Sequence, residues 1–126
     1  MGEGGIEGGK MEKRLEDLLA KIKKFRDERD WAQFHNHKDM AISIIVEASE
    51  LLEHFQWKNN EEIKEMAKAK KNEIGEEVAD VFLYLVELAD NLGIDLIEVA
   101  EKKLKKNELK YPVEKAKGSA KKYTEL

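Results

Sequence analysis

The sequence of 126 residues contains no cysteine and only one proline, and it has no long apolar run. Without cysteine there is no disulfide framework, which suits the reducing cytoplasm. A transmembrane helix needs about 20 predominantly apolar residues, and a secretory signal needs an apolar segment near the N-terminus. Neither is present, so we expect a cytoplasmic protein with no membrane partner.

Charged residues are abundant, at 40% of the chain against about 25% in typical proteins. Lys, Glu, Leu and Ala dominate, as in helical proteins. The net charge of −4 conceals an asymmetry, because residues 102–122 hold nine lysines while acidic clusters occupy residues 47–80. A nucleic-acid-binding protein needs a dominant basic surface, so we predict no nucleic-acid partner.

Apolar residues recur every three or four positions, which predicts amphipathic helices. We expect helices over residues 11–30, 39–57 and 95–110, and a fourth that ends near residue 92. A helix unbroken from residue 60 to residue 92 would span about 50 Å, so we expect a break between residues 69 and 75. The predicted fold is all-α, a four-helix-type bundle.

The domain organisation follows from composition. Residues 1–10 are rich in glycine and are expected to form a disordered leader. Residues 11–112 form the predicted helical catalytic domain, and residues 113–126 a tail. In the helix over residues 39–57, a core arc includes Met40, Ile45 and Leu52. Ile42 and Val46 fall outside that arc and indicate a subunit interface.

Two helices carry carboxylates three residues apart, Glu47 with Glu50 and Glu77 with Asp80. Residues at this spacing share a helix face, so packing the two helices together would gather four carboxylates. Two like charges about 4 Å apart repel by roughly 4 kcal/mol at an effective dielectric constant near 20. A set of oxygen ligands favours Mg²⁺, with Mn²⁺ as a substitute. The alternative is two solvated helix faces, which is the usual fate of charged runs.

Other residues suggest a ligand for such a metal. Mg²⁺ held by carboxylates commonly keeps positions for water and substrate phosphates. Lys103 and Asn107 fall on the inward stripe of the last helix, although a lysine there can also extend along the bundle edge to solvent. Several aromatic and imidazole side chains could stack on a planar base, or they could simply pack in the core. These side chains are Trp31, Phe34, His35, Trp57 and Tyr84.

The acidic pattern resembles that of the MazG-like, all-α nucleoside triphosphate pyrophosphohydrolases, in which Glu-x-x-Glu is followed by Glu-x-x-Asp. The resemblance is greatest to the dCTP pyrophosphatase branch. Five collinear stretches carry it: residues 28–35, 47–57, 80–84, 103–112 and 118–124. It implies an enzyme that hydrolyses a nucleoside triphosphate between the α and β phosphates, giving a monophosphate and pyrophosphate.

The resemblance also implies roles for individual residues. Glu47, Glu50, Glu77 and Asp80 would hold Mg²⁺ and form the catalytic set. Trp31, His35, Trp57 and Tyr84 would form the base and sugar pocket, and Lys103, Asn107 and Tyr111 would contact phosphates. The tail would lie on or near the active site. The family implies a homodimer or homotetramer with pockets near subunit boundaries.

Two departures from this pattern bear on base selectivity. The gap between Glu50 and Glu77 is shorter than in animal members, and Ile22 stands where those members have a polar pocket residue. The resemblance implies dCTP or a modified cytidine nucleotide as substrate, and the departures leave a broader range of nucleotides as alternatives. A second hypothesis is a non-catalytic helical oligomerisation module with a structural metal site.

Overall fold

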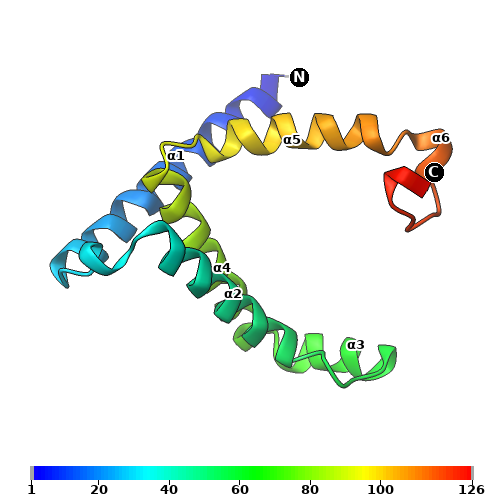
Figure 1. Cartoon of the computed structure of the whole chain (residues 1–126), viewed down its shortest axis with the longest axis horizontal. Coiled ribbons are helices and arrows are strands. Elements are labelled where there is room, and N and C mark those ends of the chain that lie inside the picture. The colour runs from blue at the N-terminus through cyan, green and yellow to red at the C-terminus, as the bar shows by residue number, and fades with distance from the viewer. Residues whose placement is uncertain (1, 126) are drawn as a thin grey trace. The chain divides into compact units, whose positions relative to one another are not determined.

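A computed structural model describes the backbone of residues 2–125 and the side chains of residues 12–125 (Figure 1). Residue 1 and the side chains of residues 2–11 lie outside the described residues, so the disordered leader over residues 1–10 stays a prediction. Every regular element of the described chain is helical, which confirms the all-α fold class. The elements are α1 (Gly2–Glu28), η1 (Ala32–Phe34), α2 (His37–Glu53), α3 (Asn60–Ala69), α4 (Lys71–Asn91), α5 (Leu96–Lys110), α6 (Val113–Ala116) and η2 (Tyr123–Glu125).

The chain divides into two compact units, Met1–Gly93 and Ile94–Leu126. In the first unit, α4 is the central helix: α2 runs alongside it, and α1 and α3 also contact it. Met40, Val86 and Ala89 are its buried apolar residues among the described side chains. No described helix combines the length and the apolar character needed to cross a membrane.

Local sequence sets where the helices begin and end. Asn36 caps α2, since its side chain accepts a hydrogen bond from the Asp39 amide at 2.8 Å. Asn59 and Glu62 form a reciprocal capping box that begins α3. The predicted break lies at Lys70, between α3 and α4. The predicted end of the second helix near residue 57 is wrong, because α2 ends at Glu53 and a turn follows.

The boundary between the units also follows from local sequence. Gly93 has a φ of +70°, a left-handed conformation that ends α4 and that glycine adopts without strain. Asp95 then caps α5 by accepting a hydrogen bond from the Glu98 amide at 3.1 Å. Pro112 follows the end of α5, as predicted.

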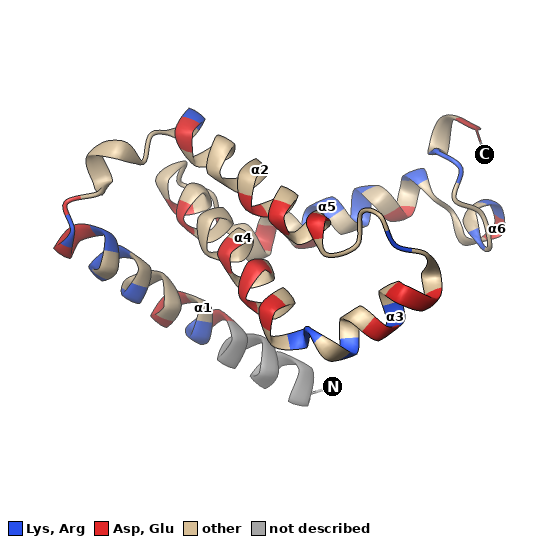
Figure 2. Ribbon diagram, turned by 90° about the horizontal axis from the view of Figure 1, so that it is seen from below, with Lys and Arg blue, Asp and Glu red and all other residues tan. Residues whose placement is uncertain are grey.

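The second unit is polar and carries nine lysines (Figure 2). Its tail folds back on the end of α5, where the rings of Tyr111 and Tyr123 meet edge to face at 6.2 Å. The Lys110 ammonium lies 5.0 Å from the centre of the Tyr123 ring. The segment that the sequence predicts as a tail thus contains two short helical elements, α6 and η2.

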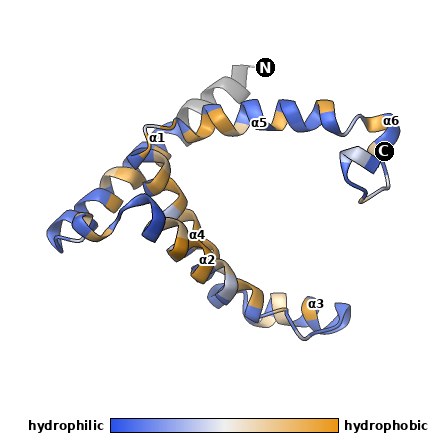
Figure 3. Ribbon diagram, viewed as in Figure 1, coloured by the Kyte–Doolittle hydropathy of each residue, from blue (hydrophilic) through white to orange (hydrophobic). Residues whose placement is uncertain are grey.

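The first unit leaves large apolar side chains exposed on α2 and α4, the two helices that show the strongest hydrophobic colouring in Figure 3. Ile42 and Val46 are exposed, as predicted. Ile45 and Leu52 were predicted to be in the core, but they are 68% and 53% exposed. That prediction is wrong for a single chain, because α2 turns its edge with Glu47 toward α4 instead. The exposed apolar side chains are Ile42, Ile45, Val46 and Leu52 on α2 and Val78, Phe82 and Leu85 on α4.

Candidate functional site

A cavity of about 460 Å³ lies in the first unit, between α4 and the segment formed by α1 and η1. This volume is within the range of about 300–1,000 Å³ that is common for small-molecule sites. Four of the predicted site residues line it: Trp31, His35, Asp80 and Tyr84. The complete lining is Leu18, Lys21, Ile22, Phe25, Arg26, Trp31, His35, Asp80, Leu83, Tyr84 and Glu87.

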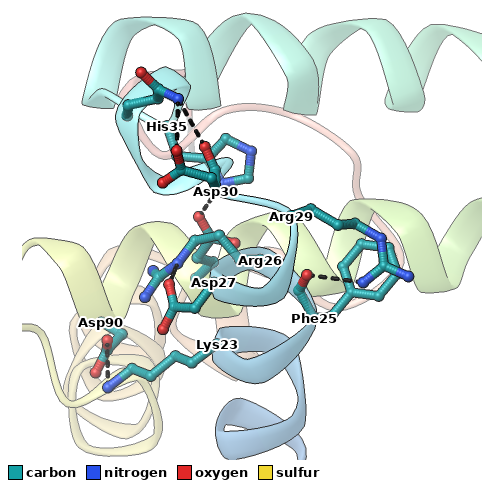
Figure 4. Close-up of polar contacts among 10 residues, drawn as sticks. Lys23, Phe25, Arg26, Asp27, Arg29, Asp30, His35 and Asp90 are labelled. Atoms are coloured by element: carbon teal, nitrogen blue, oxygen red, sulfur yellow. Dashed lines mark hydrogen bonds and ion pairs between the residues drawn. The ribbon is translucent and has the colours of Figure 1, made fainter.

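The aromatic wall of the cavity is formed where α1 ends. Asp30 has a φ of +54°, and this turn brings Trp31 back beside the helix. The rings of Phe25 and Trp31 meet edge to face at 5.6 Å. The Arg29 guanidinium lies 3.7 Å from the centre of the Phe25 ring and donates a hydrogen bond to the Phe25 carbonyl (Figure 4). Trp31 is 42% exposed, so its ring is held by contacts yet open to a ligand.

Glu87 and His35 form a polar contact across the cavity. His35 Nδ1 lies 2.5 Å from Glu87 Oε2, and Glu87 is the one charged residue that is buried among the described side chains, at 4% exposure. His35 was predicted from the sequence as a site residue, whereas Glu87 was not. The signal for Glu87 is its position as the lone charged residue in the apolar run from Val81 to Ala89.

The four predicted carboxylates come from the neighbouring helices α2 and α4, along which acidic residues recur (Figure 2). Burial is the largest influence that raises the pKa of Glu47, followed by a hydrogen bond and charge repulsion from Glu50 and by the charges of Asp80 and Glu77. The four groups are therefore electrostatic neighbours. Within the described residues, however, no three acidic or histidine side chains form a group arranged to hold a metal ion.

His54 lies against this acidic cluster. Its Nε2 is 2.7 Å from Glu77 Oε2, but the two atoms are not aligned as a hydrogen bond. Both atoms are buried and lack a hydrogen-bond partner among the described residues. The Glu77 carboxylate thus contacts an imidazole without an aligned hydrogen bond, and a bound donor or cation would satisfy its buried oxygen.

Tyr84 connects the acidic cluster to the cavity. Burial is the main cause that raises the pKa of its hydroxyl, and the charges of Glu47, Asp80 and Glu87 add to it. A hydrogen bond with Ser43 acts in the opposite direction. The Tyr84 hydroxyl therefore stays protonated and can donate a hydrogen bond.

The remaining predicted site residues lie elsewhere. Trp57 is 86% exposed and does not line the cavity. Lys103, Asn107 and Tyr111 belong to the second unit, which is described by itself. The proposed contacts of these four residues with substrate stay predictions.

Two basic residues that sequence reasoning missed also line the cavity, Lys21 and Arg26. Arg26 donates a hydrogen bond to Asp27 at 2.9 Å, which is the main cause that raises the pKa of its guanidinium. Arg26 lies between apolar residues of α1, so helical periodicity alone did not indicate that it lines a cavity. Ile22, the departure noted in the sequence, lies on the same wall.

Comparison with known proteins gives a consistent result. The model of the MazG-like family matches residues 42–126. The chain is 39% identical to dCTP pyrophosphatase 1 of Mus musculus over 117 residues, which cover 91% of this chain and 69% of the mouse protein. It is 37% identical to dCTP pyrophosphatase 1 of Homo sapiens, with the same coverage.

A solved structure supports the fold. The crystal structure of a pyrophosphatase from Archaeoglobus fulgidus superposes with a TM-score of 0.76 at 44% sequence identity. The match covers 79% of this chain and 93% of the archaeal one.

Proposed function

The chain belongs to the MazG-like family, and from this premise we propose that this nucleotide pyrophosphatase cleaves nucleoside triphosphates between the α and β phosphates. The products would be a nucleoside monophosphate and pyrophosphate. dCTP or a modified cytidine nucleotide is the proposed substrate, in keeping with the names of the mouse and human relatives. The proposed role is removal of unwanted nucleotides from the cytoplasmic pool.

The cavity is the observation that carries this proposal. Trp31, His35 and Asp80 of the acidic cluster all line this one cavity. On α4, Asp80, Tyr84 and Glu87 are spaced by four and three residues, so they follow one helix face. This arrangement suits a ligand with a planar ring at one end and a phosphate chain at the other.

Family membership implies a divalent metal, and we propose Mg²⁺ with Mn²⁺ as a substitute. Two observations fit this ion. The buried Glu77 oxygen has no hydrogen-bond partner among the described residues, and the pKa of Glu47 is raised by burial and by the neighbouring carboxylates. Carboxylate oxygens are suitable ligands for hard cations. The proposed ligands are Glu47, Glu50, Glu77 and Asp80.

The chemistry then divides between metal and protein. When bound, Mg²⁺ would neutralise phosphate charge and lower the pKa of a bound water. The protein's own groups bind and orient the substrate. Trp31 and Tyr84 offer ring surfaces to the base and sugar, and a carboxylate of the cluster orients the attacking water. Trp57 would complete the base pocket, while Lys103, Asn107 and Tyr111 would contact the phosphates.

We further propose a homodimer or homotetramer, assembled through the exposed apolar face of α2 and α4. Ile45 is 68% exposed and Phe82 43%, and large contiguous apolar patches on a protein surface mark interaction sites. A second copy would bury these side chains. Sedimentation of Ile45→Lys should show a smaller species than the wild type, and an unchanged sedimentation coefficient would reject this interface.

The decisive experiment is a panel of nucleoside triphosphates incubated with Mg²⁺, with identification of the products. Monophosphate and pyrophosphate support the proposal, and the fastest substrate defines the preferred base. Diphosphate and orthophosphate would contradict it, because they require cleavage at the other bridging position. A chain that acts only as an oligomerisation module would release neither pair.

A further inference from the structure

The contact between Glu87 and His35 suggests a role in reading the base. His35 Nδ1 and Glu87 Oε2 are 2.5 Å apart, and the side chains are only 19% and 5% exposed. Burying a carboxylate is expensive unless it is paired. A pair that is buried and also lines the ligand cavity holds its geometry before a ligand arrives.

Hydrogen-bonding chemistry then assigns the proton. An ionised carboxylate only accepts hydrogen bonds, whereas a neutral imidazole donates from one nitrogen and accepts at the other. Because Nδ1 faces the Glu87 oxygen, Nδ1 carries a proton, and whenever the ring is neutral its Nε2 is therefore the acceptor. No hydrogen bond within the described residues uses His35 Nε2, so it is available to a ligand in the cavity.

The position of the pair matches the base end of a nucleotide. Glu87 follows Asp80 by seven residues, which is two turns or about 10 Å along α4. If the phosphates lie at the Asp80 end, the base lies near Trp31, whose partly exposed ring can stack on it. His35 is four residues from Trp31 and lines the same cavity.

We propose that Glu87 is a specificity-determining positioning residue: it holds the proton on His35 Nδ1, so that Nε2 accepts a hydrogen bond from the exocyclic amino group of the base. The occupant is thus a nucleotide with an amino-substituted ring. A carbonyl at the same ring position would face the Nε2 lone pair and be rejected. This inference rests on the proposed function and specifies its substrate class.

The other groups near Glu87 support this role. Arg26 lines the cavity, and the charge of Glu87 is among the causes that raise the pKa of its guanidinium. Arg26 thereby offsets the charge of the buried carboxylate. Lys23 of α1 and Asp90 of α4 form an ion pair 3.0 Å long, but neither residue lines the cavity. That pair provides a matched control.

The test compares dCTP with dUTP, which differ at one edge group, an amino group against a carbonyl. In Glu87→Gln, the side chain keeps its size but can donate or accept, so the proton on His35 is no longer fixed. The ratio of kcat/KM for dCTP to that for dUTP should fall by about 10-fold or more, mainly through KM, as expected when a hydrogen bond to the substrate is lost. Asp90→Asn should leave the ratio unchanged.

Two further measurements keep the test independent of turnover. Nitrogen NMR of the neutral His35 ring, assigned by its loss in His35→Gln, should show the proton on Nδ1 in the wild type and a mixture of tautomers in Glu87→Gln. Calorimetric binding of dCMP and dUMP should show the same loss of discrimination. If the wild type binds dCMP selectively but hydrolyses no triphosphate, the proposed reaction fails while this inference stands.

Specific results would contradict the proposed role of Glu87. A folded Glu87→Gln with an unchanged ratio would reject the inference, as would wild-type preference for dUTP or a neutral His35 ring protonated on Nε2. Should Glu87→Gln fail to fold, His35→Gln takes its place, and retained discrimination in that variant would also reject it. When both variants fold, their effects on the ratio should not add, because they break the same contact.

Discussion

The two ends of the polar face of α4 differ in whether their buried carboxylate oxygens have hydrogen-bond partners. Near its C-terminal end, Glu87 is buried and makes a hydrogen bond with His35. Near its N-terminal end, Glu77 keeps a buried oxygen without a hydrogen-bond partner among the described residues and lies close to other carboxylates. The first end is complete within one chain. At the second end the same Glu77 oxygen lies 2.7 Å from His54 Nε2, and we propose that the cation and phosphates bind there.

The largest expected effect comes from breaking the acidic end. Asp80→Asn or Glu50→Gln should lower pyrophosphate release by more than about 100-fold, since even the outer partners of metal ligands contribute about 10–100-fold. Neither side chain is buried in the core, so circular dichroism should remain unchanged. Glu73→Gln, at an exposed position of α4, is the control. Full activity in either test variant would remove the metal assignment.

The next largest effect is expected from Trp31, which belongs to the aromatic wall of the cavity. Trp31→Ala should raise KM by about 5- to 150-fold, because stacking of an aromatic ring on a base contributes about 1–3 kcal/mol. kcat should change less, since Trp31 does not belong to the acidic cluster. Phe34→Ala offers a comparison at an exposed ring that does not line the cavity. Equal effects of the two substitutions on KM would contradict a specific role for Trp31.

The smallest effect concerns stability without metal. Because the pKa of Glu47 is raised in the folded protein, the folded state binds a proton more tightly than the unfolded state does. The metal-free protein should therefore gain stability as pH falls from the folded pKa toward the ordinary value of about 4.5 and lose it as pH rises through that window. Glu47→Gln should remove this dependence.

The same variant gives a measurable change at neutral pH. Relief of carboxylate repulsion should raise the free energy of unfolding of metal-free Glu47→Gln by about 0.2–1 kcal/mol, the range of exposed ion pairs. Added Mg²⁺ should stabilise the wild type more than this variant. Denaturant titration with and without Mg²⁺ measures both. Equal stabilisation of the two proteins by Mg²⁺ would show that the ion binds elsewhere.

Helix positions were predictable because they depend on local chemistry. The end of α4 and the break before it follow from backbone preferences and chain length, and Asn59 begins α3 through local capping. The sequence also predicted four site residues that line the cavity: Trp31, His35, Asp80 and Tyr84. The contact of His35 with Glu87 was not predictable, because 52 residues separate the partners and helix periodicity does not specify which faces meet.

The wrong prediction that Ile45 and Leu52 are buried has a related cause. Periodicity shows that Ile45 and Leu52 share an apolar face, but it does not show whether the same chain covers that face. In this protein α2 directs Glu47 toward α4, and the apolar face is left outside. The same pattern thus predicted burial correctly for Met40 and wrongly for Ile45.

The small number of buried apolar side chains among the described residues affects how the protein would respond to dilution. Within that part of the chain, only Met40, Val86 and Ala89 form the buried apolar core, and they supply little hydrophobic stabilisation. If association supplies the remainder, folding and assembly are coupled, and the melting temperature must rise with protein concentration. A thermal midpoint measured at one concentration would then describe that particular solution rather than a fixed property of the polypeptide.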